Sequence, residues 1–267
     1  MKIYQIYQIY YSDETRKSND SGFLQLDNLG NDRPDWREYW PIRKYLLENT
    51  LDENTFYGFL SPKFKDKTGL SSDQVYEFLE KNKDANVCTF SPFFDQSAIF
   101  INVFEQSNAV HPGTINFYKE LFGILDLGID ISTMCMHSLN TVYCNYFVAK
   151  PAFWRVWFAH CELIFNIAET DDHHLSVDLN AAVPHDNSQA PLKVFVIERM
   201  VSLLLSLNCW KVKPYFLNTK TFARELLINR ESELRILDSL KVAFQLSGHA
   251  SYLKLFLERR KSFFLYD

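Results

Sequence analysis

The pattern of hydrophobic and polar positions predicts strands in the first part of the chain. Three short runs rich in β-branched and aromatic residues are each followed by a polar or proline-containing segment: residues 2–11, 55–60 and 85–91. Residues 18–35 hold Asn, Asp, Gly and Pro in quantity, so we expect a loop there. Gly58 within the second run indicates a close approach of another backbone segment.

Helical patterns fill the gaps between these strands. Pro41 suits the first turn of a helix that we expect to end near Asn49. Ser71 followed by Gln74 predicts a capping box at the start of a second helix, which runs through Lys81. Strands that alternate with helices are typical of parallel sheets covered by helices. The sequence therefore predicts an α/β fold with a mainly parallel mixed sheet flanked by helices.

The second half of the chain is predicted to be richer in helix. We expect helices from Thr114, from Pro151 to about Glu169 and over residues 194–207, strands at 140–148 and near 211–216, and a polar loop at 170–190. From Thr221 onward the chain is charged and helical in pattern. We therefore expect one domain over residues 1–217 and a C-terminal helical subdomain over residues 218–267.

Composition and charge limit the classes of protein to which the chain can belong. Hydrophobic residues make up 47% and charged residues 23% of the 267 positions, which favours a folded core over disorder. The net charge of −5 and the absence of a long basic run count against a nucleic-acid partner. The five cysteines are scattered with no C-x-x-C pair, which indicates a reduced, cytoplasmic setting. The apolar run 194–207 is too short and too charged to span a bilayer.

Asp95 is a candidate for metal-assisted chemistry. It follows the strand expected at residues 85–91, and carboxylates at strand ends can hold Mn²⁺ or Mg²⁺ against a diphosphate leaving group. The usual Asp-x-Asp pair is missing. The alternative is that Asp95 caps the segment that follows it.

Two cationic side chains are candidates for holding an anion. Lys63 comes with Ser61 just after the strand expected at residues 55–60, where a phosphate or a sugar hydroxyl could bind. Arg43 lies near the aromatic residues Trp36, Tyr39 and Trp40, which together would form a stacking and anion-holding surface. The alternatives are a solvated lysine and an aromatic cluster that fixes the first helix.

Histidines and one buried carboxylate complete the candidates. His111 precedes a helix start, where it could carry a proton or act as polar filler. Adjacent His173 and His174 do not have the spacing that zinc prefers, so we expect a solvated loop there. Glu198 and Arg199 interrupt an apolar helix. They form either a structural ion pair or, through Glu198, a base that faces a site.

Three segments resemble glycosyltransferases of the GT-A type from bacterial capsule and lipopolysaccharide loci. One is residues 145–154 (NYFVAKPAFW), which leads into a helix. Another is residues 194–200 (VFVIERM), which is similar to a later helix of that family. The N-terminal strand that ends in Tyr-Tyr-Ser-Asp resembles the strand on the nucleotide side. The resemblance covers about residues 2–216.

The resemblance implies a GT-A-like fold and a glycosyltransferase, of hexosyl type, that uses a nucleotide-sugar donor. The acceptor would be a glycan or lipid-linked sugar in surface polysaccharide synthesis. The implied sites are Tyr11, Ser12 and Asp13 near the nucleotide, Asp95 near the metal or diphosphate, and Asn145 and Glu198 near the sugars. With the candidates above, Arg43 and Lys63 join the donor side, and His111 and Tyr146 join Asn145 on the acceptor side.

Two alternatives accompany this interpretation. The chain could be a non-catalytic module with a transferase-like fold that binds a glycan or a partner protein. Residues 252–264 combine apolar and basic side chains, so this segment could lie on a membrane surface near a lipid-linked acceptor or pack as an ordinary helix. The expected location is the cytoplasm, with peripheral contact at the inner membrane face.

Overall fold

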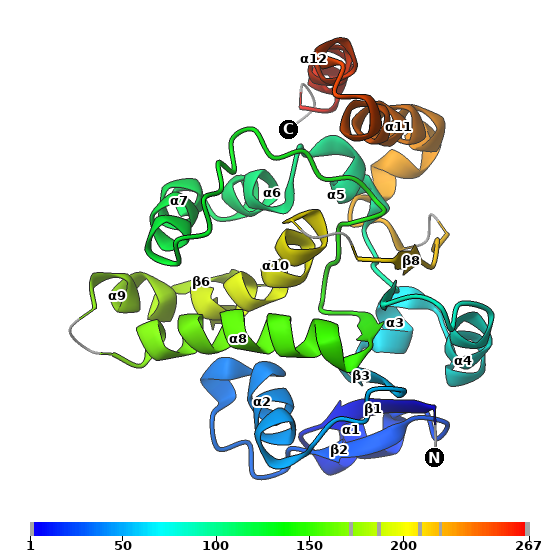
Figure 1. The fold of residues 1–267 in the computed structure, drawn as a ribbon, viewed down its shortest axis with the longest axis vertical. Helices are drawn as coiled ribbons and strands as arrows, with labels where there is room; N and C mark the ends of the chain where they lie inside the picture. The colour runs from blue at the N-terminus through cyan, green and yellow to red at the C-terminus, as the bar shows by residue number, and fades with distance from the viewer. Residues whose placement is uncertain (1–2, 171–172, 186–187, 208–209, 219–220, 265–267) are drawn as a thin grey trace. The chain divides into compact units, whose positions relative to one another are not determined.

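The computed structural model describes residues 3–170, 173–185, 188–207, 210–218 and 221–264, and the chain divides into two compact units (Figure 1). The first unit comprises Met1–Ser91 and Val142–Phe216, and the second comprises Pro92–Thr141 and Leu217–Asp267. Residues 92–141, which we expected in the larger domain, belong with the C-terminal segment instead.

The first unit is built on a six-stranded sheet with the order β2-β1-β3-β5-β4-β8. Its strands are β1 (Tyr4–Tyr10), β2 (Leu24–Asp27), β3 (Phe56–Leu60), β4 (Val87–Thr89), β5 (Phe147–Ala149) and β8 (Val212–Pro214). The pairings β1–β2, β1–β3 and β4–β8 are parallel, whereas β5 runs antiparallel to both of its neighbours. The predicted α/β fold with a mostly parallel mixed sheet and flanking helices is confirmed.

Gly58 explains how closely β3 and β5 approach each other. It pairs with Val148, and a Cβ atom at this position would lie 2.7 Å from Val148 Cγ2 and 3.3 Å from the nearest side-chain atoms of Ile6. Any larger residue would have to displace the side chains of Val148 and Ile6. Gly58 thus makes room for the side chains of Val148 and Ile6, and not for a backbone segment as expected.

Two helices of the first unit, α4 and α8, begin where local sequence signals place them. Ser71 accepts from the backbone N–H of Gln74, which confirms the predicted capping box. Pro151 occupies the first turn of the long helix, where its missing N–H costs nothing. The helices are α1 (Asp13–Ser18), α2 (Tyr39–Glu48), α3 (Phe64–Thr68), α4 (Ser72–Lys81), α8 (Pro151–Ala168), α9 (His174–Asn180) and α10 (Leu192–Leu207).

Several segments differ from the prediction. The loop expected at residues 18–35 contains β2 and the start of a short 3-10 helix, η1 (Pro34–Trp36). The loop expected at residues 170–190 contains α9 and a hairpin of β6 (Ala182–His185) and β7 (Ser188–Pro191). Of the strand expected at 140–148, only the end joins the sheet as β5. These elements are short and polar, so their sequences carry little periodicity to reveal them.

The second unit is helical. It holds α5 (Phe94–Ile99), α6 (Val103–Val110), α7 (Thr114–Ile124), η3 (Glu225–Arg230), α11 (Glu231–Ser247), α12 (Ala250–Arg259) and η4 (Arg260–Phe263). Phe256 and Phe263 are buried in its core, whereas Tyr252, Leu255 and Phe264 are exposed. Within the described residues, no helix combines the length and apolar character needed to cross a membrane.

Candidate functional site

The carboxyl ends of the parallel strands in the first unit border a cavity of about 320 Å³. Tyr11 follows β1, Asn28 follows β2 and Ser61 follows β3, and all three line it. Because β5 runs in the opposite direction, the residues before it, Asn145 and Tyr146, reach the same edge. This edge is where open α/β sheets bind ligands, and the volume suits a small molecule.

Charged side chains of both signs line the cavity. The cations are Arg37, Lys63 and Lys67, and the carboxylates are Glu38 and Glu198. Lys67 lies one helical turn after Lys63, where α3 begins. A cavity with three cations near two carboxylates can hold an anionic group and still present a proton acceptor.

Glu198 is the carboxylate with the most perturbed surroundings in this cavity. It lies on α10, among apolar residues, and burial raises its pKa above the ordinary value. Arg199 and Lys67 act in the opposite direction and only partly offset the burial. The carboxyl of Glu198 is therefore poised closer to neutrality than a solvated glutamate, which suits a general base. The Arg199 guanidinium donates to the Phe195 carbonyl, 2.9 Å away.

Lys67 and Cys144 are in contact in the wall of the cavity. The Lys67 Nζ lies 3.3 Å from the Cys144 Sγ. Burial and the nearby Glu198 raise the pKa of Cys144 to about 12, so this group is a thiol at neutral pH. Burial lowers the pKa of Lys67, but Cys144 and Glu198 outweigh that effect and leave the pKa raised. Lys67 therefore brings a positive charge to the cavity.

Backbone strain concentrates in this cavity. Of the six non-glycine residues with positive φ that the structure describes, four line it: Asn31, Arg37, Cys144 and Asn145. Such conformations cost free energy and persist mainly where function or packing requires them. In addition, the Asn145 Oδ1 atom is buried and has no hydrogen-bond partner within the described part of the chain. A buried acceptor of this kind suits an incoming donor group.

Some predicted donor-side residues have structural roles in the first unit. Ser12 caps α1 and forms a capping box with Thr15, and Asp13 is exposed in the first turn of that helix. Arg43 donates to Glu162 on α8 at 2.7 Å and lies 4.1 Å above the Phe165 ring. The aromatic cluster near Arg43 thus packs α2 against α8. None of these three predicted residues lines the cavity.

Asp95 and His111 belong to the second unit. The Asp95 carboxylate is fully buried and accepts from the backbone N–H groups of Ala223, at 2.9 Å, and Arg224, at 3.2 Å. Gln96 donates to it as well, at 2.9 Å. Asp95 therefore does not cap the segment that follows it, as the alternative expected, but ties α5 to the backbone at residues 223–224. With these three donors, the carboxylate does not fit a metal ligand with free lone pairs. His111 is buried at the end of α6, where its carbonyl accepts from the Thr114 hydroxyl at 2.9 Å.

The described residues hold no cluster of three or more His, Cys, Asp or Glu side chains that could bind a metal ion. In the histidine loop, His173 caps α9 by accepting from the backbone N–H of Leu175 at 3.2 Å. The neighbouring Asp171 and Asp172 lie outside the described residues.

Sequence reasoning missed several cavity residues. Arg37 and Glu38 lie in the turn before α2. The aromatic residues around them favour a packing role for this turn in the sequence pattern. Lys67 could have been found from its spacing to Lys63, because residues four apart share a helix face. Asn28 and Asn31 follow β2, a strand that the pattern did not predict.

The fold and the cavity define an α/β protein with a ligand-sized site at the carboxyl edge of its sheet. Comparison with protein families, with curated proteins and with solved structures found no match to this chain.

Proposed function

We propose that this protein is a glycosyltransferase with a GT-A-like first unit, which moves a sugar from a nucleotide-sugar donor to a hydroxyl of a glycan or lipid-linked acceptor. The observation that carries the proposal is the cavity at the carboxyl edge of the sheet. It brings together Tyr11, Lys63, Asn145, Tyr146 and Glu198, which the sequence assigned to donor, acceptor and catalysis from separate parts of the chain.

The cations of the cavity suit the diphosphate of the donor. Arg37, Lys63 and Lys67 would hold its negative charge and stabilise the charge that develops on it as the sugar departs. Arginine forms bidentate contacts with phosphate, and lysine acts as a point charge. The Tyr11 ring is 45% exposed at the end of β1 and would stack on the base.

Glu198 would serve as the general base. In the transfer step, an acceptor hydroxyl oxygen forms a bond to the anomeric carbon, and its proton passes to the Glu198 carboxylate. The bond between that carbon and the diphosphate oxygen breaks, and its electron pair leaves with the nucleoside diphosphate. The buried Asn145 Oδ1 would accept a hydrogen bond from a sugar hydroxyl. A divalent metal at the diphosphate stays a prediction, and no step here requires one.

The test measures binding and turnover separately. Calorimetry with a panel of nucleotide sugars, with and without Mn²⁺, should detect a donor that binds the wild-type chain. Release of nucleoside diphosphate in the presence of glycan acceptors should then fall by about 100-fold or more in Glu198→Gln, because general base catalysis contributes on the order of 10²–10⁴. The control Glu77→Gln changes an exposed carboxylate on α4 and should leave turnover unchanged.

Each outcome has a distinct meaning. No binding by any nucleotide sugar contradicts the proposal. Donor binding without turnover supports the alternative of a non-catalytic binding module. If turnover requires Mn²⁺, the result supports the divalent metal that the resemblance implies. Contact of the segment 252–264 with a membrane, which would bring a lipid-linked acceptor within reach, is part of the same proposal.

A further inference from the structure

We propose that Lys193 is a positioning residue, which fixes the segment 28–38 against α10 and so sets the shape of the ligand cavity. This inference rests on the proposed function for the identity of the ligand. The segment supplies one wall of the cavity through Asn28, Asn31, Pro34, Arg37 and Glu38.

Only one side chain of the segment 28–38 is held in place by hydrophobic burial. Among residues 24–38, all of which the structure describes, Trp36 is the only side chain that is buried. A segment that buries so little apolar surface gains little from packing to offset the entropy of ordering it. Its position must therefore depend on polar contacts.

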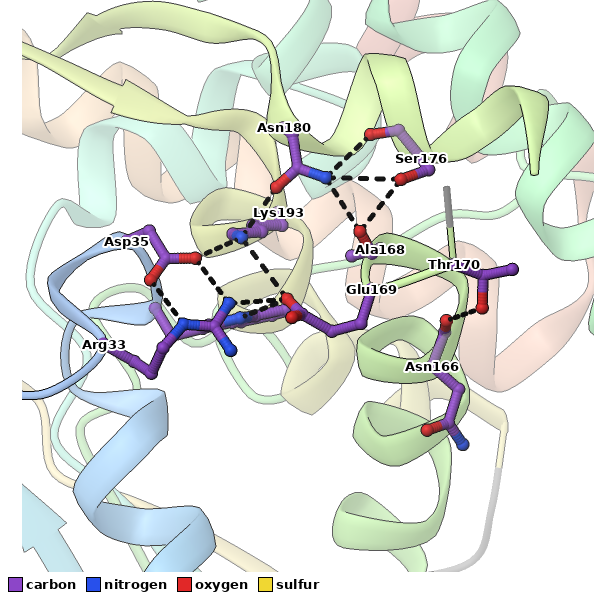
Figure 2. A network of polar contacts seen from close by, with 10 residues as sticks. Arg33, Asp35, Asn166, Ala168, Glu169, Thr170, Ser176, Asn180 and Lys193 are labelled. Atoms are coloured by element: carbon purple, nitrogen blue, oxygen red, sulfur yellow. Dashed lines mark hydrogen bonds and ion pairs between the residues drawn. The ribbon is translucent and has the colours of Figure 1, made fainter. Parts of the chain in front are cut away.

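Lys193 supplies the central polar contact (Figure 2). Its side chain is 1% exposed, and its Nζ lies 2.5 Å from Asp35 and 2.7 Å from the Asn180 Oδ1. The same Nζ lies 4.3 Å above the Trp36 ring and 3.8 Å from Glu169. The ammonium thus touches η1, the end of α8 and α9, while the lysine itself belongs to the first turn of α10.

Arg33 completes the network from the other side of η1. Its guanidinium forms a bidentate pair with Asp35, at 2.8 and 2.9 Å, and reaches Glu169 at 2.7 Å. The Trp36 indole N–H also donates to Glu169, at 2.9 Å. Burial alone would raise the pKa of Asp35, but Arg33 and Lys193 lower it to about 2. The network therefore carries two cations and two carboxylates at neutral pH.

The network connects two segments that line the cavity. On α10, Val194, Phe195 and Glu198 line the cavity just after Lys193. On the other wall, Arg37 directly follows Trp36 and is held at a φ of 46°. Because a non-glycine residue avoids this conformation unless its surroundings impose it, the contacts beside Arg37 must hold it there. The loss of Lys193 would leave Asp35 with one cation and free the segment to relax.

The experiment compares Lys193→Met and Asp35→Asn with Arg155→Met. Arg155 pairs with Glu53 on the surface of α8 and does not line the cavity, so it is a control for the loss of an ion pair to α8. Hydrogen exchange should show lost protection at the N–H groups of Trp36 and Arg37, which bond to Arg33 and Pro34 in the native state. The dissociation constant of the best nucleotide-sugar donor should rise at least tenfold in both network variants and stay unchanged in Arg155→Met.

The outcomes separate this inference from the proposed function. Lost protection together with weaker donor binding supports it, and folded variants with unchanged exchange or unchanged affinity overturn it. If Lys193→Met does not fold, the nearly isosteric Asp35→Asn gives the same decision. If the wild-type chain binds none of the donors, the proposed function fails. Hydrogen exchange alone then decides whether Lys193 holds the segment 28–38.

Discussion

The hydroxyl oxygens of Ser61 and Tyr146 lie 2.7 Å apart at the carboxyl edge of the sheet. Ser61 follows β3, and Tyr146 precedes the reversed strand β5, so the contact joins segments 85 residues apart in the sequence. Both residues line the cavity, and the Tyr146 ring itself is fully buried. This hydrogen bond therefore connects the ends of two adjacent strands. It lies next to Asn145, whose backbone has a positive φ.

Tyr146→Phe should lower the free energy of unfolding by about 1 kcal/mol, because it removes one intramolecular hydrogen bond and leaves the ring in place. Urea denaturation at neutral pH measures the change. Tyr252→Phe is the control, since Tyr252 is 40% exposed on α12. Equal stability of wild type and Tyr146→Phe would show that the contact between the two hydroxyls contributes nothing.

Asn145→Gly should separate the backbone strain at this position from the role of the Asn145 side chain in binding. Glycine adopts the φ of 54° without penalty, so the variant should be more stable than wild type by about 1 kcal/mol or less. The same change removes the buried Oδ1, a hydrogen-bond acceptor, so affinity for the acceptor glycan should fall about tenfold. Calorimetry and denaturation measure the two effects. Asp126→Gly, at an exposed position with a φ of 49°, should gain stability only.

Glu198→Gln should change how stability depends on pH. Burial raises the folded-state pKa of Glu198, so the folded chain binds more protons than the unfolded chain between the two pKa values. Wild-type stability therefore falls as pH rises through this window, and the glutamine removes that loss. The variant should gain stability relative to wild type as the pH rises from the ordinary glutamate pKa toward the raised folded-state pKa, by about 1.4 kcal/mol per unit of pKa shift.

Denaturation curves at several pH values in this window measure the difference. A constant difference between Glu198→Gln and wild type across the window would contradict a raised pKa. Glu77→Gln serves as the control here too, because Glu77 is exposed and pairs with Lys81, which lowers its pKa.

Gly58→Ala should destabilise the first unit by about 2 kcal/mol, because the new Cβ would lie 2.7 Å from Val148 Cγ2 in the sheet. Thermal denaturation measures the loss. Gly123→Ala, in α7 with open space around the site, should instead gain a few tenths of a kcal/mol to about 1 kcal/mol. Equal effects of the two substitutions would contradict the packing argument.

The sequence by itself determined the elements with strong local signals. The strands that became β1, β3 and β4, the capping box at Ser71 and the helix that starts at Pro151 were all predicted correctly. These features depend on neighbours within a few residues or on a period that the chain displays directly.

The tertiary structure alone decided which charged residues meet. Asp95 and Lys63 have similar sequence signals, since each follows a buried strand, yet they belong to different compact units. Arg37 carries no recognisable motif and enters the cavity because η1, which it directly follows, packs beside α10. Charged residues do not recur at a regular spacing along the chain. The partners of a charged side chain are therefore set by contacts between segments that lie far apart in the sequence. The reversed direction of β5, which brings Asn145 and Tyr146 to that edge, is likewise a property of the folded sheet.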